Sequence, residues 1–183
     1  MTTKELFDLN GQVAIVTGGR GLYGASISEG LCEAGATVII ASRNGAACDE
    51  YAQTLRDKGY NAVGMSLDLS NDASIKQLAA DVVAKFGKID ILINGAGGNK
   101  AQATISKDQD FFNLDLDAFK WVFDLNVTGA VLTTMVFGEL LAKQGYGNVI
   151  NIASMSSYHP LTNTVAYCGA KAAVYNFTEW MAT

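Results

Sequence analysis

Residues 12–24 read QVAIVTGGRGLYG, an apolar run that passes directly into a glycine-rich stretch. Gln12–Val16 is short and rich in β-branched residues, which is typical of a buried strand in a parallel sheet. The glycines of residues 17–24 stand between this strand and a helix predicted from about Tyr23 to Ala34. The free N–H groups and positive dipole end of such a helix bind the phosphates of a dinucleotide. The stretch therefore predicts a phosphate-binding turn, and a turn with only a structural role is the alternative.

Strands and helices alternate along the rest of the chain, which predicts the α/β class: a Rossmann-type, doubly wound parallel sheet with helices on both faces. We expect one dinucleotide-binding domain over residues 1–183, with the longest helix bent near Gly129. Residues Gly97–Leu114 lack periodicity, and loops of that length are often functional. Further strands are predicted at Thr37–Ala41, Ala62–Leu67, Ile89–Asn94 and Asn148–Ala153, and further helices at Ala47–Lys58, Asp72–Phe86, Leu116–Lys143 and from Thr164 or Val165 onward.

The composition is 49% hydrophobic and 17% charged, as expected of a globular protein. A net charge of −5 without a Lys/Arg cluster argues against a nucleic-acid partner. We expect no signal peptide in MTTKELFDLNGQ, which lacks an apolar segment, and no membrane span, because Gly129–Ala142 is too short and too polar. Cys32, Cys48 and Cys168 lack metal-ligand spacing, so we expect reduced thiols, a cytoplasmic protein and no metal site.

The end of the second predicted strand carries Ser42 and Arg43, where an acidic residue would accept hydrogen bonds from the ribose of NAD. Arg43, and Arg20 in the glycine turn, are suited to bind a 2′-phosphate through charge-assisted hydrogen bonds. This pattern favours NADP(H) and leaves NAD(H) possible. The alternative is that both arginines are solvated surface residues.

The glycine turn resembles the Thr-Gly-x-x-x-Gly-x-Gly motif of the short-chain dehydrogenase/reductase family. It matches at Thr17, Gly18 and Gly24, but Leu22 stands where glycine is usual, and Gly21 is displaced by one position. The resemblance extends over essentially the whole chain. Turn and resemblance together predict cofactor contacts from Gly18, Arg20, Gly21, Leu22, Tyr23, Gly24, Ser42, Arg43, Asp68, Leu69, Asn94, Ala96, Gly97, Tyr167 and Lys171.

Two more motifs of that family follow at predicted strand ends. Asp68 matches the acidic residue that contacts adenine in the family. Asn94-Gly95-Ala96-Gly97 matches the family's Asn-Asn-Ala-Gly, with Gly95 in place of an asparagine. Each motif alone is weak evidence, but all of them in order, at the ends of the right strands, are specific.

Four residues match the family's catalytic set: Asn126, Ser154, Tyr167 and Lys171, with Ser154 placed 13 residues before Tyr167, as in the family. The resemblance implies hydride transfer between nicotinamide and a carbinol or carbonyl carbon, with Tyr167 as general acid/base. Lys171 follows one helical turn later on the same face and would favour the phenolate. Ser154 would donate a hydrogen bond to the substrate oxygen, and Asn126 would anchor a water that links Lys171 to solvent. An ordinary amphipathic helix is the alternative for Tyr167 and Lys171.

Three segments, Asn94–Asn99, Phe123–Asn126 and His159–Thr162, resemble the family branch of sugar-acid oxidoreductases that act on mannonate/fructuronate or gluconate/ketogluconate. Lys100 lies just beyond the fourth predicted strand, where open α/β sheets bind ligands, and is a candidate partner for a substrate carboxylate.

Family members usually continue beyond the helix that carries Tyr167, with two more strands and a substrate-covering loop, so we expect this chain to be C-terminally incomplete. The resemblance also implies a homo-oligomer, a tetramer or a dimer, formed through Leu116–Lys143 and the Tyr167 helix. The competing hypothesis is a non-catalytic nucleotide sensor or scaffold that retains the fold. A P-loop protein fits less well, because no Gly-Lys-Ser/Thr follows the first strand.

Overall fold

The structure is a computed structural model that describes residues 2–183. The chain divides into two compact units, Met1–Gly95 with Leu132–Ile150, and Ala96–Val131 with Asn151–Thr183. We call them the sheet unit and the helical unit and describe each by itself. That residues 1–183 form a single dinucleotide-binding domain stays a prediction.

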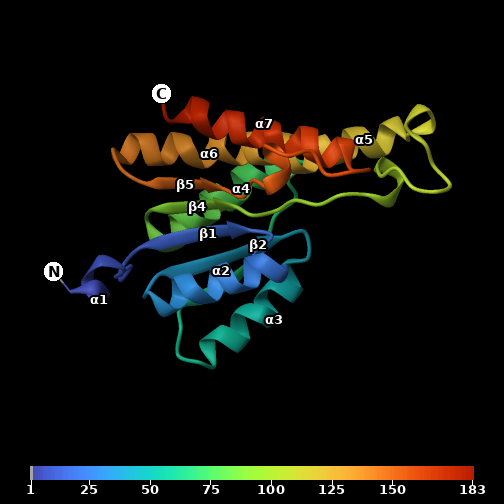
Figure 1. The fold of residues 1–183 in the computed structure, drawn as a ribbon. Coiled ribbons are helices and arrows are strands. Elements are labelled where there is room, and N and C mark those ends of the chain that lie inside the picture. The colour runs from blue at the N-terminus through green and yellow to red at the C-terminus, as the bar shows by residue number, and fades with distance from the viewer. Residues whose placement is uncertain (1) are drawn as a thin grey trace. The chain divides into compact units, whose positions relative to one another are not determined.

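The five strands form one parallel sheet in the order β3-β2-β1-β4-β5 (Figure 1). Strand β1 pairs with β2 on one side, where Val13 lies opposite Thr37, and with β4 on the other, where Ala14 lies opposite Ile91. The predicted Rossmann-type α/β class is therefore confirmed. The strands are β1 (Val13–Thr17), β2 (Thr37–Ser42), β3 (Ala62–Ser66), β4 (Ile91–Asn94) and β5 (Asn148–Asn151).

The helices of the sheet unit begin and end where local sequence signals place them. The Asn44 side chain accepts a hydrogen bond from the N–H of Ala47, and the Asn71 side chain caps α4 in the same way. Gly87, with a φ of 76°, ends α4. The single turn α1 was not predicted. The helices are α1 (Thr3–Leu6), α2 (Leu22–Glu33), α3 (Gly45–Arg56), α4 (Asp72–Phe86) and α6 (Gly129–Gln144), which belongs to this unit from Leu132.

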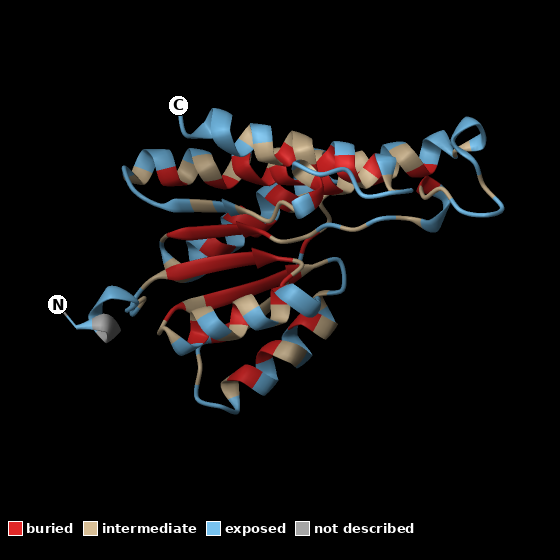
Figure 2. Cartoon of the chain, viewed as in Figure 1, coloured by how far each residue is buried: buried red, intermediate tan, exposed pale blue. Residues whose placement is uncertain are grey.

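The core of the sheet unit consists of large aliphatic side chains packed on both faces of the sheet. Strands β1, β2 and β4 are buried along almost their whole length, as Figure 2 shows. Ile15 and Ile39 pack with α4 and with Phe137 of α6, whereas the alternate residues of the strands face the side of α2 and α3. Burial on both faces explains why these strands read as continuous apolar runs.

Among the residues that the structure describes, Asp90 is the charged side chain that is buried in the sheet unit. It accepts a hydrogen bond of 2.7 Å from the backbone N–H of Val13 and pairs with Lys88 at 3.0 Å. The bond to Asp90 raises the pKa of Lys88 above its ordinary value. Asp90 therefore fastens the start of β4 to the start of β1.

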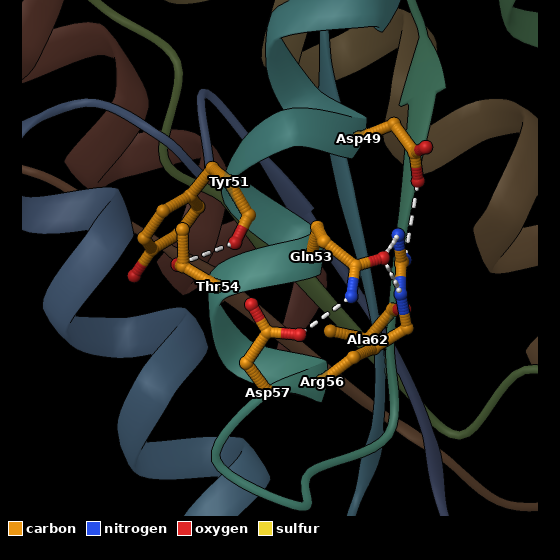
Figure 3. Close-up of polar contacts among 7 residues, drawn as sticks. All are labelled: Asp49, Tyr51, Gln53, Thr54, Arg56, Asp57 and Ala62. Carbon is orange, nitrogen blue, oxygen red and sulfur yellow. Dashed lines mark hydrogen bonds and ion pairs between the residues drawn. The ribbon is translucent and has the colours of Figure 1, made fainter.

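A polar network fixes the C-terminal half of α3 against β3 (Figure 3). The Arg56 guanidinium donates to the Asp49 carboxylate at 3.1 Å, to the Gln53 side chain at 2.7 Å and to the carbonyl of Ala62 at 2.8 Å. The bond from Arg56 holds the pKa of Asp49 below its usual range. The network holds the helix that follows Ser42 and Arg43 against its neighbouring strand.

The helical unit has a core of small side chains. Ala103, Ala118, Val122, Ala166 and Ala170 are buried together, and aromatic rings pack against them. A π-helical segment ends at the residue before Gly129, near which a bend was predicted. The elements of this unit are η1 (Ala101–Ala103), η2 (Phe111–Asn113), α5 (Leu116–Phe123), the π-helix η3 (Asp124–Thr128), the start of α6, η4 (Met155–Ser157) and α7 (Val165–Met181).

One helical stretch of the described residues, Leu116–Gln144, is long and apolar enough to cross a membrane by length and composition alone. The sequence prediction considered only Gly129–Ala142, whereas the helix continues over 29 residues. The same test is passed by core helices of globular proteins. Phe137 and Leu141 of this stretch lie in the core of the sheet unit, which is the packing expected of such a helix.

Candidate dinucleotide site and catalytic residues

The glycine turn joins β1 to α2 and has no room for side chains at its tightest point. Gly21 donates a hydrogen bond to the Gly18 carbonyl at 2.9 Å and is the N-cap of α2. A Cβ atom on Gly24 would lie 2.1 Å from the same carbonyl, so only glycine fits there. Leu22, in contrast, is the first residue of α2 and is 86% exposed, so a side chain is accepted at this departure from the family motif.

The turn has the features of a phosphate site. It follows β1, which is flanked by β2 and β4, and ligands of open α/β sheets bind where the strand order reverses in this way. No side chain of the described residues caps the N-terminus of α2, so the first N–H groups of this helix are left for another acceptor. Arg20 and Tyr23 are exposed beside it. The residues present therefore fit a dinucleotide diphosphate.

The strand ends that would hold the adenosine part carry the other predicted residues of the sheet unit. Arg43 is exposed after β2, and the Ser42 hydroxyl lies 2.9 Å from the thiol of Cys48. Asp68 accepts hydrogen bonds from the hydroxyl and the N–H of Ser70, at 2.7 and 3.0 Å. These bonds, with the charge of Arg43, hold the pKa of Asp68 below its usual range. Leu69 packs partly against the core.

Asn94, at the end of β4, uses its side chain inside the sheet unit. Its amide oxygen accepts a 2.6 Å hydrogen bond from Thr133, and its amide nitrogen donates at 3.0 Å to Thr134. The side chain therefore holds the end of β4 to α6. A contact between Asn94 and the cofactor stays a prediction.

In the helical unit, Asn126 binds the backbone of Gly98 in both directions. Its amide nitrogen donates to the Gly98 carbonyl at 2.7 Å, and its amide oxygen accepts from the Gly98 N–H at 3.2 Å. The nitrogen also donates to the carbonyl of Val122 at 2.8 Å. Asn126 lies in the π-helix, where the regular hydrogen-bond pattern changes and a side chain can supply a donor. The pairing was not predicted, although the three glycines among residues 95–98 are a signal for close backbone contacts.

Lys171 is buried beside this pair. Its ammonium donates a 2.7 Å hydrogen bond to the Ile152 carbonyl and lies 5.8 Å from the centre of the Tyr167 ring. A Cβ on Gly97 would lie 2.6 Å from Asn126 Oδ1 and 3.1 Å from Lys171 Nζ, so both groups border the space that a side chain at Gly97 would fill. Burial lowers the pKa of Lys171 below that of a free lysine. Tyr167 and Lys171 lie one turn apart on α7, as predicted.

Ser154 is the N-cap of η4, where its hydroxyl oxygen accepts a hydrogen bond of 3.2 Å from the N–H of Ser156. An accepted bond leaves the hydroxyl hydrogen available to another acceptor. Cys168, next to Tyr167, is a buried free thiol whose sulfur accepts from the N–H of Leu161.

The helical unit thus contains all four predicted catalytic residues, Asn126, Ser154, Tyr167 and Lys171, and also Ala96 and Gly97 of the predicted cofactor contacts. The other predicted cofactor contacts lie in the sheet unit. Among residues 2–183, no cluster of His, Cys, Asp or Glu suits a metal ion.

Comparisons with known proteins give relatives that align with nearly all of this chain but with only part of their own length. The oxidoreductase UxuB of Bacillus subtilis is 36% identical over 183 residues, which cover 96% of this chain and 66% of the relative. A 7alpha-hydroxysteroid dehydrogenase of Bacteroides fragilis is 29% identical, over 94% of this chain and 65% of its own. The chain thus spans slightly less than two thirds of the length of these relatives.

Solved structures resemble this one closely. A proposed D-mannonate oxidoreductase from Haemophilus influenza, with bound NAD, superposes with a TM-score of 0.90 at 35% identity, over 99% of this chain and 68% of the other. A xylitol dehydrogenase with bound NAD+ gives 0.85 at 32% identity, over 94% and 64%. The short chain dehydrogenase family matches residues 12–183. This chain therefore belongs to the short chain dehydrogenase family.

Proposed function

We propose that this chain is part of an NAD(P)-dependent oxidoreductase that transfers a hydride between nicotinamide and a secondary alcohol or carbonyl. The observation that carries the proposal is that Asn126 and Lys171 both border the space beside Gly97, in the same compact unit as Tyr167 and Ser154. A non-catalytic nucleotide sensor has no use for a buried lysine one turn from a tyrosine, since an unpaired buried charge costs stability.

The residues of the helical unit would manage the proton and the substrate oxygen. The nicotinamide, when bound, accepts or supplies the hydride. Tyr167 would take the proton from the alcohol, or return it to the carbonyl oxygen in the reverse direction. Ser154 would donate its free hydroxyl hydrogen to the same oxygen. Because burial lowers the pKa of Lys171, its ammonium gives up a proton more readily than a free lysine and is suited to relay one from Tyr167.

The cofactor would lie with its diphosphate at the turn of residues 18–24. We favour NADP(H), because Arg20 and Arg43 are exposed and the residues directly after β2 include no acidic side chain. NAD(H) is the alternative, and two of the similar structures hold NAD.

The substrate we propose is a sugar acid, such as mannonate/fructuronate or gluconate/ketogluconate. Its support is the similarity to the proposed D-mannonate oxidoreductase of Haemophilus influenza. We further propose that the whole protein is cytoplasmic and forms a homo-oligomer, a tetramer or a dimer. Light scattering on the whole protein tests the oligomeric state.

The cofactor proposal is tested by parallel fluorescence titrations of the whole protein with NADPH and NADH, repeated with Arg43→Ala and Arg20→Ala. We expect tighter NADPH binding that is lost in Arg43→Ala, since a hydrogen bond to a charged group contributes about 1.5–3 kcal/mol. Equal binding of both cofactors in the wild type would reject NADP(H) selection by Arg43. Binding of neither cofactor would reject the dinucleotide site itself.

A further inference from the structure

Lys100 follows the segment that Asn126 holds, and its ammonium is unusually placed for a lysine. The side chain is half-buried, and Nζ lies 4.4 Å from the centre of the Trp121 ring. No carboxylate forms an ion pair with it among the described residues. A cation on an aromatic face is held in one place, while its remaining N–H groups stay free to donate.

The backbone at Lys100 is fixed as well. The Asn99 side chain donates to the Thr104 hydroxyl at 3.0 Å, and this hydroxyl donates to the carbonyl of Lys100 at 2.9 Å. Gly98, two residues earlier, is bound on both sides by Asn126. Two residues of extended chain span at most about 7 Å. The Lys100 backbone therefore lies close to Gly98 and to the Asn126 side chain that binds it.

Trp121, the ring that Lys100 contacts, packs against the same cluster of buried residues as Tyr167, the predicted general acid/base. Trp121 and Tyr167 both pack against the small alanine-rich core of the helical unit. The other lysines of this unit differ from Lys100. Lys120 pairs with Asp117 at 3.3 Å, Lys171 is buried, and Lys107 is exposed.

We propose that Lys100, held on the Trp121 ring, binds the carboxylate of the substrate and thereby selects acids over neutral alcohols. The inference rests on the proposed function and adds the residue that would recognise the acid group. A fixed ammonium with free donors matches a carboxylate, and in a chain of net charge −5 a local positive site is needed to attract one. Lys100 is then a specificity-determining residue, and the chemical step stays with Tyr167.

The test measures the binding of D-mannonate and D-gluconate by calorimetry to the whole protein saturated with cofactor, with mannitol as the neutral probe. The variants are Lys100→Met, Lys100→Arg and the matched control Lys107→Met. We expect Lys100→Met to weaken aldonate binding by about 10- to 100-fold, the value of a charged hydrogen bond. Lys100→Arg should restore part of the loss, and Lys107→Met should bind like the wild type. In steady-state assays the loss should appear in KM and leave kcat nearly unchanged.

Three outcomes would overturn the inference. They are unchanged aldonate binding in Lys100→Met, an equal loss for mannitol, and a loss of NADH binding, which would assign Lys100 to a cofactor phosphate. A wild type that oxidises neutral secondary alcohols but binds no aldonate rejects the acid site and leaves the oxidoreductase proposal standing. A wild type that binds aldonates through Lys100 but turns over no alcohol or carbonyl rejects the oxidoreductase proposal and leaves the acid site standing.

Discussion

The two units of the molecule bury different kinds of side chain. The sheet unit fills its core with large aliphatic residues and Phe137, whereas the helical unit has a core of alanines. Both units also bury polar groups: Asp90, Asn94 and Thr133 are among those of the sheet unit, and Asn126, Ser156 and Lys171 are those of the helical unit among the described residues. Apolar burial stabilises a fold in proportion to its area, while buried polar groups cost stability unless they are hydrogen-bonded. The difference between the two cores predicts that apolar burial stabilises the sheet unit more, while all four predicted catalytic residues lie in the helical unit.

The buried polar groups of the helical unit differ in how fully they are hydrogen-bonded. Asn126 satisfies its amide with the backbone of Gly98 and Val122, and Lys171 donates to the Ile152 carbonyl. The hydroxyl of Ser156 is buried without a hydrogen-bond partner in the described part of the chain. Substitutions in the two units should therefore separate activity from stability, and the largest effects should fall on activity.

Replacing Tyr167 by phenylalanine should give the largest effect on activity with little effect on stability. A positioned general acid/base contributes about 10²- to 10⁴-fold, so kcat/KM should fall by about that factor, measured by NAD(P)H absorbance on the whole protein. The control is Tyr175→Phe, two turns later on α7, where the hydroxyl donates to Glu179 at 2.7 Å. Similar losses in both variants would mean that Tyr167 only packs.

Replacing Phe137 by alanine should break the sheet unit instead. The ring is fully buried in the main core, and removal of such a side chain costs about 3–5 kcal/mol of unfolding free energy. Urea unfolding followed by circular dichroism measures the loss. The matched control Phe112→Ala removes a ring that is 90% exposed and should change stability by less than about 0.5 kcal/mol. A small loss of unfolding free energy in Phe137→Ala would contradict the view that the apolar core of the sheet unit contributes most of the stability.

Replacing Gly97 by alanine should disturb Asn126 and Lys171, two of the predicted catalytic residues. Its Cβ would lie 2.6 Å from Asn126 Oδ1, so the amide must move. Since small misplacements of catalytic groups can cost about 100-fold, we expect kcat/KM to fall by about tenfold or more. The neighbouring Gly98→Ala is the control, because its Cβ meets only Leu125, at 3.6 Å. Equal activity of the two variants would show that the contact is not needed.

The sheet unit could be predicted from sequence because its signals are local. Apolar runs with β-branched residues mark each strand, and the predicted strands begin within two residues of those observed. Asparagine and glycine likewise mark helix ends such as Asn71 and Gly87. The role of Asp90 was missed, since its hydrogen bond joins residues 77 positions apart. The available signal was the position of Asp90 within the apolar run Ile89–Ile93, which indicates a buried charge with a fixed partner.

The helical unit was predicted less completely, because its key contacts depend on which segments meet in space. The catalytic residues could be proposed from motifs, but the pairing of Asn126 with Gly98 and the stacking of Lys100 on Trp121 have no local pattern. The π-helix was not predicted, because the change from the α-helical to the π-helical hydrogen-bond pattern has no marker among its own residues.

The smallest effect we predict concerns the pH dependence that Lys171 gives to stability. Burial lowers its pKa in the folded protein, so the unfolded chain, with a lysine pKa of about 10.4, binds more protons between the two values. Unfolding free energy therefore rises with pH across that window. Lys171→Met lacks this rise, whereas Lys88, whose pKa is raised, titrates equally in both proteins and cancels in the difference. Urea unfolding at about pH 8 and about pH 10 should show the wild type gaining stability relative to Lys171→Met. Parallel changes in the two proteins would mean that the Lys171 ammonium is not penalised by burial, and the small-residue core of the helical unit would then hold a buried charge at no cost in stability.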